Sequence, residues 1–122
     1  MIYETDFQKS IENAFLKYGA SVAQERSIPD VRDGLKIGLR QGLYAQYTHK
    51  HTHKDKFQKA AKSVAAAMGQ SYVHGDIAMY DTFIRAARPW SYRYLLEETQ
   101  GSAGDPTAPD SQSAMRYVEM RS

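Results

Sequence analysis

Apolar residues recur every three or four positions in four stretches of the chain, which is the period of an α-helix. The first stretch, residues 7–22, follows Asp6, whose side chain is suited to cap a helix. An extended segment is expected over residues 26–28, because Pro29 restricts the backbone that precedes it. The next stretch predicts a second helix over residues 35–47.

The third and fourth helices are predicted over residues 56–68 and 76–87. Gly69 is expected to stop the third helix, and Asp76 is expected to cap the fourth. A tight turn over residues 69–75 therefore joins the two helices.

The pattern changes after Pro89, from helical periodicity to short segments that suit strands. Residues 91–96 are aromatic and aliphatic enough for one strand, and residues 115–120 for a returning strand. Residues 100–113 between them are rich in turn-forming Gly and Pro. Two short helices joined by a tight turn and followed by a β-hairpin form a winged helix. We therefore predict a mainly α domain with a small β wing, and its fourth helix would be presented to DNA.

The composition fits one soluble globular domain over residues 1–122, with 42% hydrophobic and 25% charged residues. The sequence has no cysteine, which excludes disulfides, thiolate metal sites and a cysteine nucleophile. No apolar run approaches the roughly 18 residues of a spanning helix, and the first residues lack the pattern of a signal peptide. We therefore expect a cytoplasmic protein without a membrane partner.

Positive charge is concentrated in the central third of the chain. Residues 26–62 contain nine Lys or Arg and three Asp, a net charge of +6, although the whole chain carries only +2. Such a stretch indicates a polyanionic partner. A solvated basic face without a partner explains the composition equally well.

Three histidines, His49, His51 and His53, alternate within this basic stretch. Histidine-rich tracts can bind metal, and a strand would place all three rings on one face. The flanking Lys50 and Lys54 repel a cation, however. No metal site is therefore predicted, and a basic loop near phosphate is favoured.

Two further positions have a chemistry that residue type alone leaves open. His74 lies at the predicted start of the fourth helix, where backbone N–H groups favour an anion, but an ordinary turn and cap is the alternative. Tyr117 follows Arg116, and by residue type alone this pair is packing or surface decoration. The sequence contains no Gly-rich phosphate loop, so ATP binding by this chain is not expected.

Several motifs occur in a fixed order: ERSIPDVRDGLK at residues 25–36, HGD at 74–76, AMYDT at 78–82, PWS at 89–91 and AMRYVE at 114–119. Together they resemble the breakage–reunion subunit of type IIA DNA topoisomerases, the family that comprises the A subunits of DNA gyrase and topoisomerase IV. The resemblance extends from about residue 6 to the end of the chain.

This resemblance implies a winged-helix domain that forms part of a DNA gate and meets its copy across a two-fold axis, as a homodimer. In that family a tyrosine cuts DNA transiently through a 5′-phosphotyrosine link, and religation follows after a second duplex has passed. The complete enzyme is an ATP-dependent isomerase. The 122-residue chain alone is expected to be inactive.

By the same resemblance, Tyr117 is the nucleophile. Arg116, Arg26 and His74 would surround the scissile phosphate, where positive charge and donors stabilise the transition state. The residues that would hold the DNA backbone are Lys36, Arg40, Arg85 and Arg32.

The chain departs from the family pattern at several positions. Ile77 stands where gyrases often carry serine, and that serine, with an acidic residue that is Asp81 here, anchors a water–magnesium bridge to quinolone-type drugs. Leu39 and Gln41 replace a DNA-facing polar residue and an arginine. These departures predict a divergent, phage-like member with altered DNA contacts.

The cofactors and partners implied by the resemblance lie mostly outside this chain. Mg²⁺ would be bound mainly by a partner subunit, which would also use ATP, and the substrate would be double-stranded DNA in the cytoplasm of a bacterial or phage-infected cell. The tower, the coiled-coil exit gate and the C-terminal domain of the family are absent from residues 1–122. The alternative is a free-standing winged-helix protein that binds DNA, or inhibits a topoisomerase, without cutting DNA.

Overall fold

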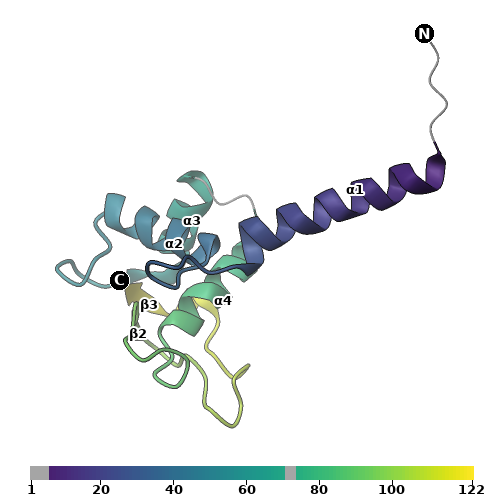
Figure 1. Cartoon of the computed structure of the whole chain (residues 1–122). Helices are drawn as coiled ribbons and strands as arrows, with labels where there is room; N and C mark the ends of the chain where they lie inside the picture. The colour runs from purple at the N-terminus through teal and green to yellow at the C-terminus, as the bar shows by residue number, and fades with distance from the viewer. Residues whose placement is uncertain (1–5, 71–73) are drawn as a thin grey trace. The chain divides into compact units, whose positions relative to one another are not determined.

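The structure is a computed structural model that describes residues 6–70 and 74–122, so the middle of the predicted turn at 69–75 lies outside the described residues. The chain divides into two compact units, Met1–Ile37 and Gly38–Ser122, called here the N-terminal and C-terminal units. Helices dominate, with one small three-stranded antiparallel sheet (Figure 1). The predicted fold class is confirmed.

The N-terminal unit contains helix α1 (Phe7–Val22), which continues as a short π-helix, η1 (Ala23–Ser27). Asp6 caps α1 as predicted, because its side chain accepts a 3.0 Å hydrogen bond from the Gln8 amide. The predicted extended segment over residues 26–28 is wrong except at Ile28, which has φ −86° and ψ 120°. Proline restricts only the residue directly before it, so the helix continues up to Ser27.

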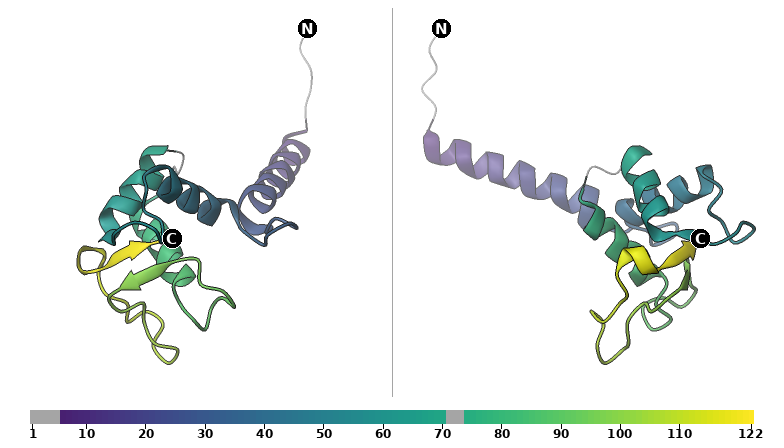
Figure 2. Two further views of the ribbon diagram at one scale, coloured as in Figure 1. Left: turned by 90° about the vertical axis from the view of Figure 1, so that its left-hand side faces the viewer. Right: turned by 180° about the vertical axis from the view of Figure 1, so that it is seen from behind.

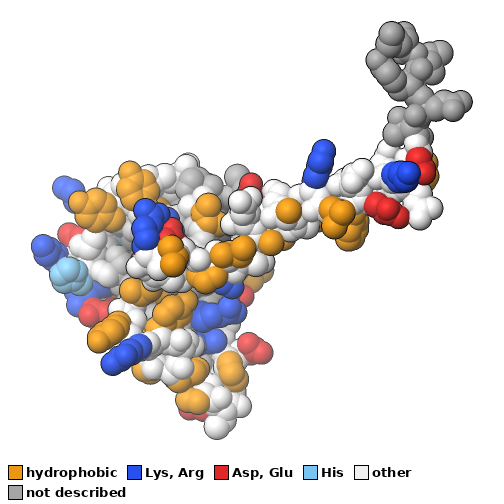
Figure 3. Space-filling view, viewed as in Figure 1, with side chains coloured by type: hydrophobic (Ala, Val, Ile, Leu, Met, Phe, Trp, Pro, Cys, Tyr) orange, Lys and Arg blue, Asp and Glu red, His pale blue; other side chains and the backbone are white. Residues whose placement is uncertain are grey.

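Helix α1 buries none of its residues. Its large apolar side chains are 50–78% exposed: Phe7, Ile11, Phe15, Leu16 and Tyr18. Figure 3 shows hydrophobic side chains at the surface along this helix. The helical period therefore predicted the element correctly, but it did not indicate a core.

The C-terminal unit holds the remaining elements: α2 (Ile37–Thr48, which begins at the end of the N-terminal unit), β1 (Gln58–Lys59), α3 (Ala60–Gln70), α4 (Asp76–Ala86), β2 (Glu98–Gln100), the 3-10 helix η2 (Met115–Tyr117) and β3 (Glu119–Arg121). The core consists of buried side chains from α2, α3, α4 and β3, among them Ala45, Val64, Met79, Phe83 and Met120. Burial of this apolar surface stabilises the unit.

Gly42 of α2 lies against α4 within this core. A Cβ atom at Gly42 would lie 2.5 Å from Cε of Met79 and 2.7 Å from Cε1 of Phe83, closer than real Cβ atoms approach other atoms. The missing side chain at Gly42 therefore leaves room for the side chains of α4.

The sheet has the order β1-β3-β2, so β3 pairs with a strand on each side. Met120 is the register partner of both Gln58 and Thr99. Figure 2 shows β2 and β3 side by side and running in opposite directions. The predicted hairpin is present, and β1 adds a third strand to it.

The predicted strands were misplaced at both ends of the hairpin. Residues 91–96 form no strand: the amide of Leu96 donates to the carbonyl of Ala86 at 3.3 Å, which ties this segment to the end of α4. Residues 115–120 do not form one strand, because the first three wind into η2 and only β3 pairs in the sheet.

Several helix boundaries also differ from the prediction. Residues 58–59 pair in the sheet, so α3 begins at Ala60 rather than at residue 56, and it continues through Gly69. Gly75 is the N-cap of α4. Asp76 is instead the first helical residue, and its carboxylate accepts a 2.9 Å hydrogen bond from the Ile77 amide. An acidic residue in the first turn still complements the helix dipole.

In the parts of the chain that the structure describes, no helix is long and apolar enough to cross a membrane.

Candidate active site

Tyr117 is the last residue of η2, directly before the buried start of the sheet. Its amide donates a 2.8 Å hydrogen bond to the carbonyl of Ala114, which closes the 3-10 turn. Tyr117 is 67% exposed, whereas Val118 and Met120 are fully buried. The chain on either side therefore holds the backbone of a tyrosine whose ring lies at the surface.

The guanidinium of Arg116 lies over the ring of Tyr117, with Cζ 4.8 Å from the ring centroid. A cation in this position is attracted to the negative face of the ring. It also places a full positive charge beside the phenolic group. The structure therefore brings these two predicted site residues into direct contact.

The segment after Tyr117 is anchored on α3 and β1. The amide of Ala60 donates a 2.9 Å hydrogen bond to the carbonyl of Val118. Lys59 forms a 3.0 Å ion pair with Glu119, in which both side chains are partly exposed. Such a pair contributes about 1 kcal/mol or less, so the buried side chains of Val118 and Met120 provide most of the anchoring.

The segment before Tyr117 is attached to α4. The hydroxyl of Tyr80 donates a hydrogen bond to the carbonyl of Ser113, and burial raises the pKa of Tyr80, so this hydroxyl remains a donor. The side-chain amide of Gln112 donates to Oδ1 of Asp81 at 3.3 Å. Asp81, the predicted acidic position of the drug bridge, thus contacts the loop that leads to Tyr117.

Ile77, the other drug-bridge position, lies one helical turn before Asp81 on α4. It is 71% exposed, although it is an apolar residue. Met79 and Phe83 fill the core in its place. The side chain at position 77 is therefore accessible to a ligand.

The other predicted contacts in the C-terminal unit come from separate elements. Arg85 is exposed in the last turn of α4, His74 is exposed just before the N-cap, and Arg40 is half-buried on α2. Helix N-termini attract anions, and at this one the carboxylate of Asp76 already accepts from the Ile77 amide.

Three predicted residues belong to the N-terminal unit: Arg26 in η1, and Arg32 and Lys36 in the segment that follows it. The guanidinium of Arg32 donates to both carboxylate oxygens of Asp30, at 3.0 and 2.8 Å. Hydrogen bonding to Asp30 raises the pKa of Arg32. Arg32 is therefore already paired, whereas Lys36 is exposed.

Leu39, which replaces a residue that is polar and DNA-facing in the family, is buried. Leu39 is 5% exposed on the core side of α2. A polar residue at this position of α2 would be buried, so the apolar side chain contributes to the core.

The three histidines of the central loop differ in exposure, and the ring centroids of His49 and His51 lie 6.3 Å apart. His51 is buried, with Nδ1 3.2 Å from Oγ of Ser63. Burial lowers the pKa of His51, and the positive charges of His49 and Lys62 lower it further. His53 is exposed. Among the described residues, no three metal-ligating side chains form a group that could hold a metal ion.

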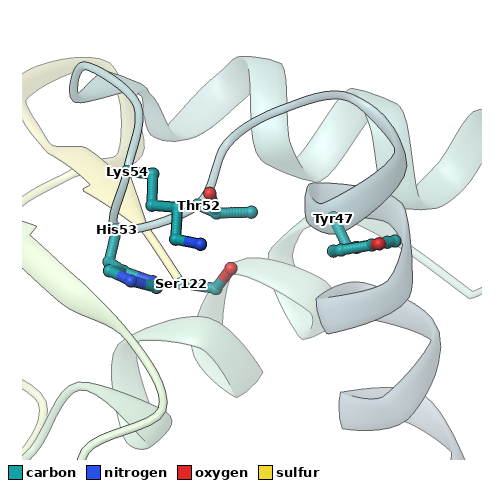
Figure 4. A pocket seen from close by; sticks show the side chains of 5 residues that line it. All are labelled: Tyr47, Thr52, His53, Lys54 and Ser122. Carbon is teal, nitrogen blue, oxygen red and sulfur yellow. The ribbon is translucent and has the colours of Figure 1, made fainter.

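A shallow pocket lies beside this loop, lined by Tyr47, Thr52, His53, Lys54 and Ser122. Figure 4 shows four of these side chains gathered together, with Tyr47 standing apart from them on α2. Neither Tyr117 nor Arg116 lines the pocket. The ring of Tyr117 is 67% exposed, so the candidate active site lies at the surface.

Comparisons with known proteins identify relatives that match nearly the whole chain. The sequence model that describes the A subunits of DNA gyrase and topoisomerase IV matches residues 26–122. The chain is similar to the A subunit of DNA gyrase from Mycolicibacterium smegmatis, with 42% identity over 98% of this chain and 14% of that protein. It is also similar to the A subunit of DNA topoisomerase 4 from Staphylococcus aureus, with 37% identity over 99% of this chain and 15% of that protein. The chain spans about one seventh of the length of these relatives, and it belongs to the family of DNA gyrase and topoisomerase IV A subunits.

Proposed function

We propose that this chain is the DNA-gate part of a type IIA topoisomerase and that Tyr117 cuts DNA through a transient covalent link. The observation that carries the proposal is the guanidinium of Arg116 over the exposed ring of Tyr117, at 4.8 Å. An exposed tyrosine with a fixed backbone can reach a phosphodiester of DNA, a polymer that is too large to enter a pocket. The cation beside its ring complements the negative charge of the phosphate.

In the proposed reaction, the phenolic oxygen of Tyr117 attacks a backbone phosphorus and loses its proton. The bond from phosphorus to the 3′ oxygen breaks, a 5′-phosphotyrosine forms, and the 3′ oxygen leaves as a hydroxyl. Arg116 and Arg26 stabilise the negative charge of the transition state, and His74 holds a phosphate oxygen. The link conserves the energy of the broken bond, so the reverse reaction reseals the strand.

Among the residues that the structure describes, no three metal-ligating side chains form a group that could hold a metal ion. Mg²⁺ held by the carboxylates of a partner subunit would neutralise charge on the phosphate. The same partner would use ATP. Two copies of this chain's parent protein, as a homodimer, would cut the two strands.

Basic residues of this chain would hold the DNA backbone. Lys36, Arg40 and Arg85 contribute to this contact, and Arg32 contributes less because Asp30 pairs with it. We further propose that residues 1–122 act together as one winged-helix domain of a cytoplasmic enzyme. A DNA-binding module that does not cut is the competing function.

A chimeric enzyme tests the proposal. Residues 1–122 would replace the matching segment of the gyrase A protein from Mycolicibacterium smegmatis, and the chimera would be combined with the subunit that completes that enzyme, Mg²⁺ and supercoiled DNA. Detergent followed by protease should release linear DNA, because denaturation traps the protein-linked break. The isolated chain should bind DNA without linearising it. A chimera that binds DNA but gives no protein-linked break would support the binding module instead.

A further inference from the structure

Arg88 follows the end of α4 and is only 9% exposed. Its guanidinium donates three hydrogen bonds: Nε to the carbonyl of Ala103 at 2.8 Å, and Nη2 to the carbonyl of Pro109 at 2.5 Å and to Oε1 of Gln112 at 3.0 Å. Hydrogen bonds from a charged donor are about twice as strong as neutral ones. Arg88 is therefore a buried cation held by three neutral oxygens.

These three oxygens lie on both limbs of the loop between β2 and η2, residues 101–114. The loop contains one isolated bridge, between Asp105 and Ala108, and no helix or strand of its own. A planar guanidinium with five donors can satisfy several acceptors at fixed angles, which a lysine ammonium cannot reproduce. Arg88 thus ties the two limbs to each other and to α4.

Further hydrogen bonds fasten the part of the loop that lies just before the candidate nucleophile Tyr117. Oε1 of Gln112 accepts from Arg88, which leaves its Nε2 to donate to Asp81 at 3.3 Å. The next residue, Ser113, accepts a hydrogen bond from the hydroxyl of Tyr80. The loop is therefore fastened to α4 at two successive residues directly before η2 begins.

Tyr117 lies between two anchored segments. Its own ring is 67% exposed, so packing of the ring does not fix its position. Val118, on the other side, is fully buried. Only two residues and the single turn of η2 separate Gln112 from Tyr117. A displacement of Gln112 would therefore also displace Tyr117.

We propose that Arg88 is a positioning residue for Tyr117: by holding both limbs of the loop against α4, it sets where the tyrosine ring stands. This inference rests on the proposed function for its catalytic consequence. The positioning itself is a property of this chain and can be measured without cleavage.

The test compares Arg88→Lys with Arg93→Lys as its matched control. Arg93 is exposed, five residues further on, and its Cζ lies 5.8 Å from the centroid of the Tyr94 ring, much as that of Arg88 lies 5.9 Å from the Trp90 ring. Gln112→Leu is a second variant. It removes the hydrogen bonds of Gln112 to Arg88 and Asp81, and it leaves those of Arg88 to the carbonyls of Ala103 and Pro109. Circular dichroism confirms that each variant is folded.

The first readout is the NMR spectrum of the full chain with ¹³C-labelled tyrosine rings, in which Tyr117 is identified by its loss in Tyr117→Phe. Arg88→Lys and Gln112→Leu should both shift or broaden the Tyr117 signals, and Arg93→Lys should leave them in place. Unchanged Tyr117 signals in folded Arg88→Lys or, if that variant does not fold, in Gln112→Leu would overturn the positioning role.

The second readout is cleavage in the chimeric enzyme, measured per molecule of bound DNA. Arg88→Lys should lower the yield of protein-linked DNA about tenfold or more with DNA affinity unchanged, because a misplaced nucleophile slows the reaction without weakening binding. Equal cleavage by Arg88→Lys and Arg93→Lys would overturn the catalytic consequence. A wild-type chimera that never links to DNA would refute the proposed function, while the NMR result would still decide the positioning.

Discussion

The side-chain amide of Gln46 donates a 3.0 Å hydrogen bond to the carboxyl group of Glu97, and both side chains are buried. Oε1 of Gln46 and Oε1 of Glu97 have no other hydrogen-bond partner among the described groups. Two acceptor oxygens cannot satisfy each other unless one carries a proton. A protonated Glu97 supplies that donor, and burial raises the pKa of Glu97 to about 8.

The first prediction is that this pair makes stability fall as the pH rises. Glu97 keeps its proton in the folded state up to about pH 8, whereas its ordinary pKa is 4.5, so unfolding releases a proton between these values. The contribution of Glu97 to the free energy of unfolding is complete below about pH 4.5 and is lost as the pH rises through about 8. The loss is about 5 kcal/mol. Glu97→Gln, which has a neutral amide in place of the acid, should make the free energy of unfolding depend less on pH.

Urea unfolding from pH 5 to pH 9 measures this effect. Glu97→Gln should gain stability relative to the wild type as the pH rises, and the exposed neighbour variant Glu98→Gln should keep the wild-type slope. Parallel curves for the wild type and Glu97→Gln would show that Glu97 is charged in the folded state.

The second prediction concerns the salt dependence of DNA binding. Binding should be weak, tolerant of sequence and strongly salt-dependent, because residues 26–62 carry a net charge of +6. With about four to six phosphates neutralised, log affinity should fall with log salt at a slope of roughly −4 to −5. Lys36→Ala should reduce the slope by about one, and Arg32→Ala by less, because Asp30 already pairs with Arg32.

Fluorescence anisotropy with a labelled duplex at increasing salt measures these slopes. Lys17→Ala, an exposed lysine outside the basic stretch, serves as the control. Affinity that stays flat between low and physiological salt would mean that the basic stretch is not the binding surface.

The third prediction is that the parent enzyme responds weakly to quinolone-type drugs. Ile77 is 71% exposed and has no group that can hydrogen-bond to bound water, and Asp81 is already engaged by Gln112. Ile77→Ser should raise the yield of drug-stabilised cleavage in the chimeric enzyme. The same drug response with Ile and Ser at position 77 would show that the side chain there does not determine sensitivity.

The helices and the wing could be predicted from the sequence because each leaves a local signal. Helical spacing identified α1 to α4, and the Gly- and Pro-rich stretch identified the loop before Tyr117. The two-residue strand β1 could not be predicted, since it exists only through its pairing with β3, about 60 residues away in the sequence. Pairing over such a distance depends on the tertiary fold and not on local preference.

The candidate site divides in the same way. Tyr117 and Arg116 are adjacent in the sequence, so their motif and their contact could both be expected. Arg88 gave no signal, because its three acceptors come together only when the loop folds back on α4. The burial of Gln46 could have been suspected from the sequence, because this polar residue lies at helical spacing from the apolar positions of α2.

The assignment of Tyr117 as the nucleophile is tested most directly by mapping the covalent link between the chimeric enzyme and DNA. After cleavage with Mg²⁺ and the partner subunit, nuclease digestion and mass spectrometry should place a 5′-phosphate nucleotide on Tyr117. Tyr117→Phe should abolish the adduct and leave DNA binding nearly unchanged, because only the phenolic oxygen is lost. An adduct that persists in Tyr117→Phe, or that maps to Tyr80 or Tyr94, would contradict the assignment of Tyr117 as the nucleophile.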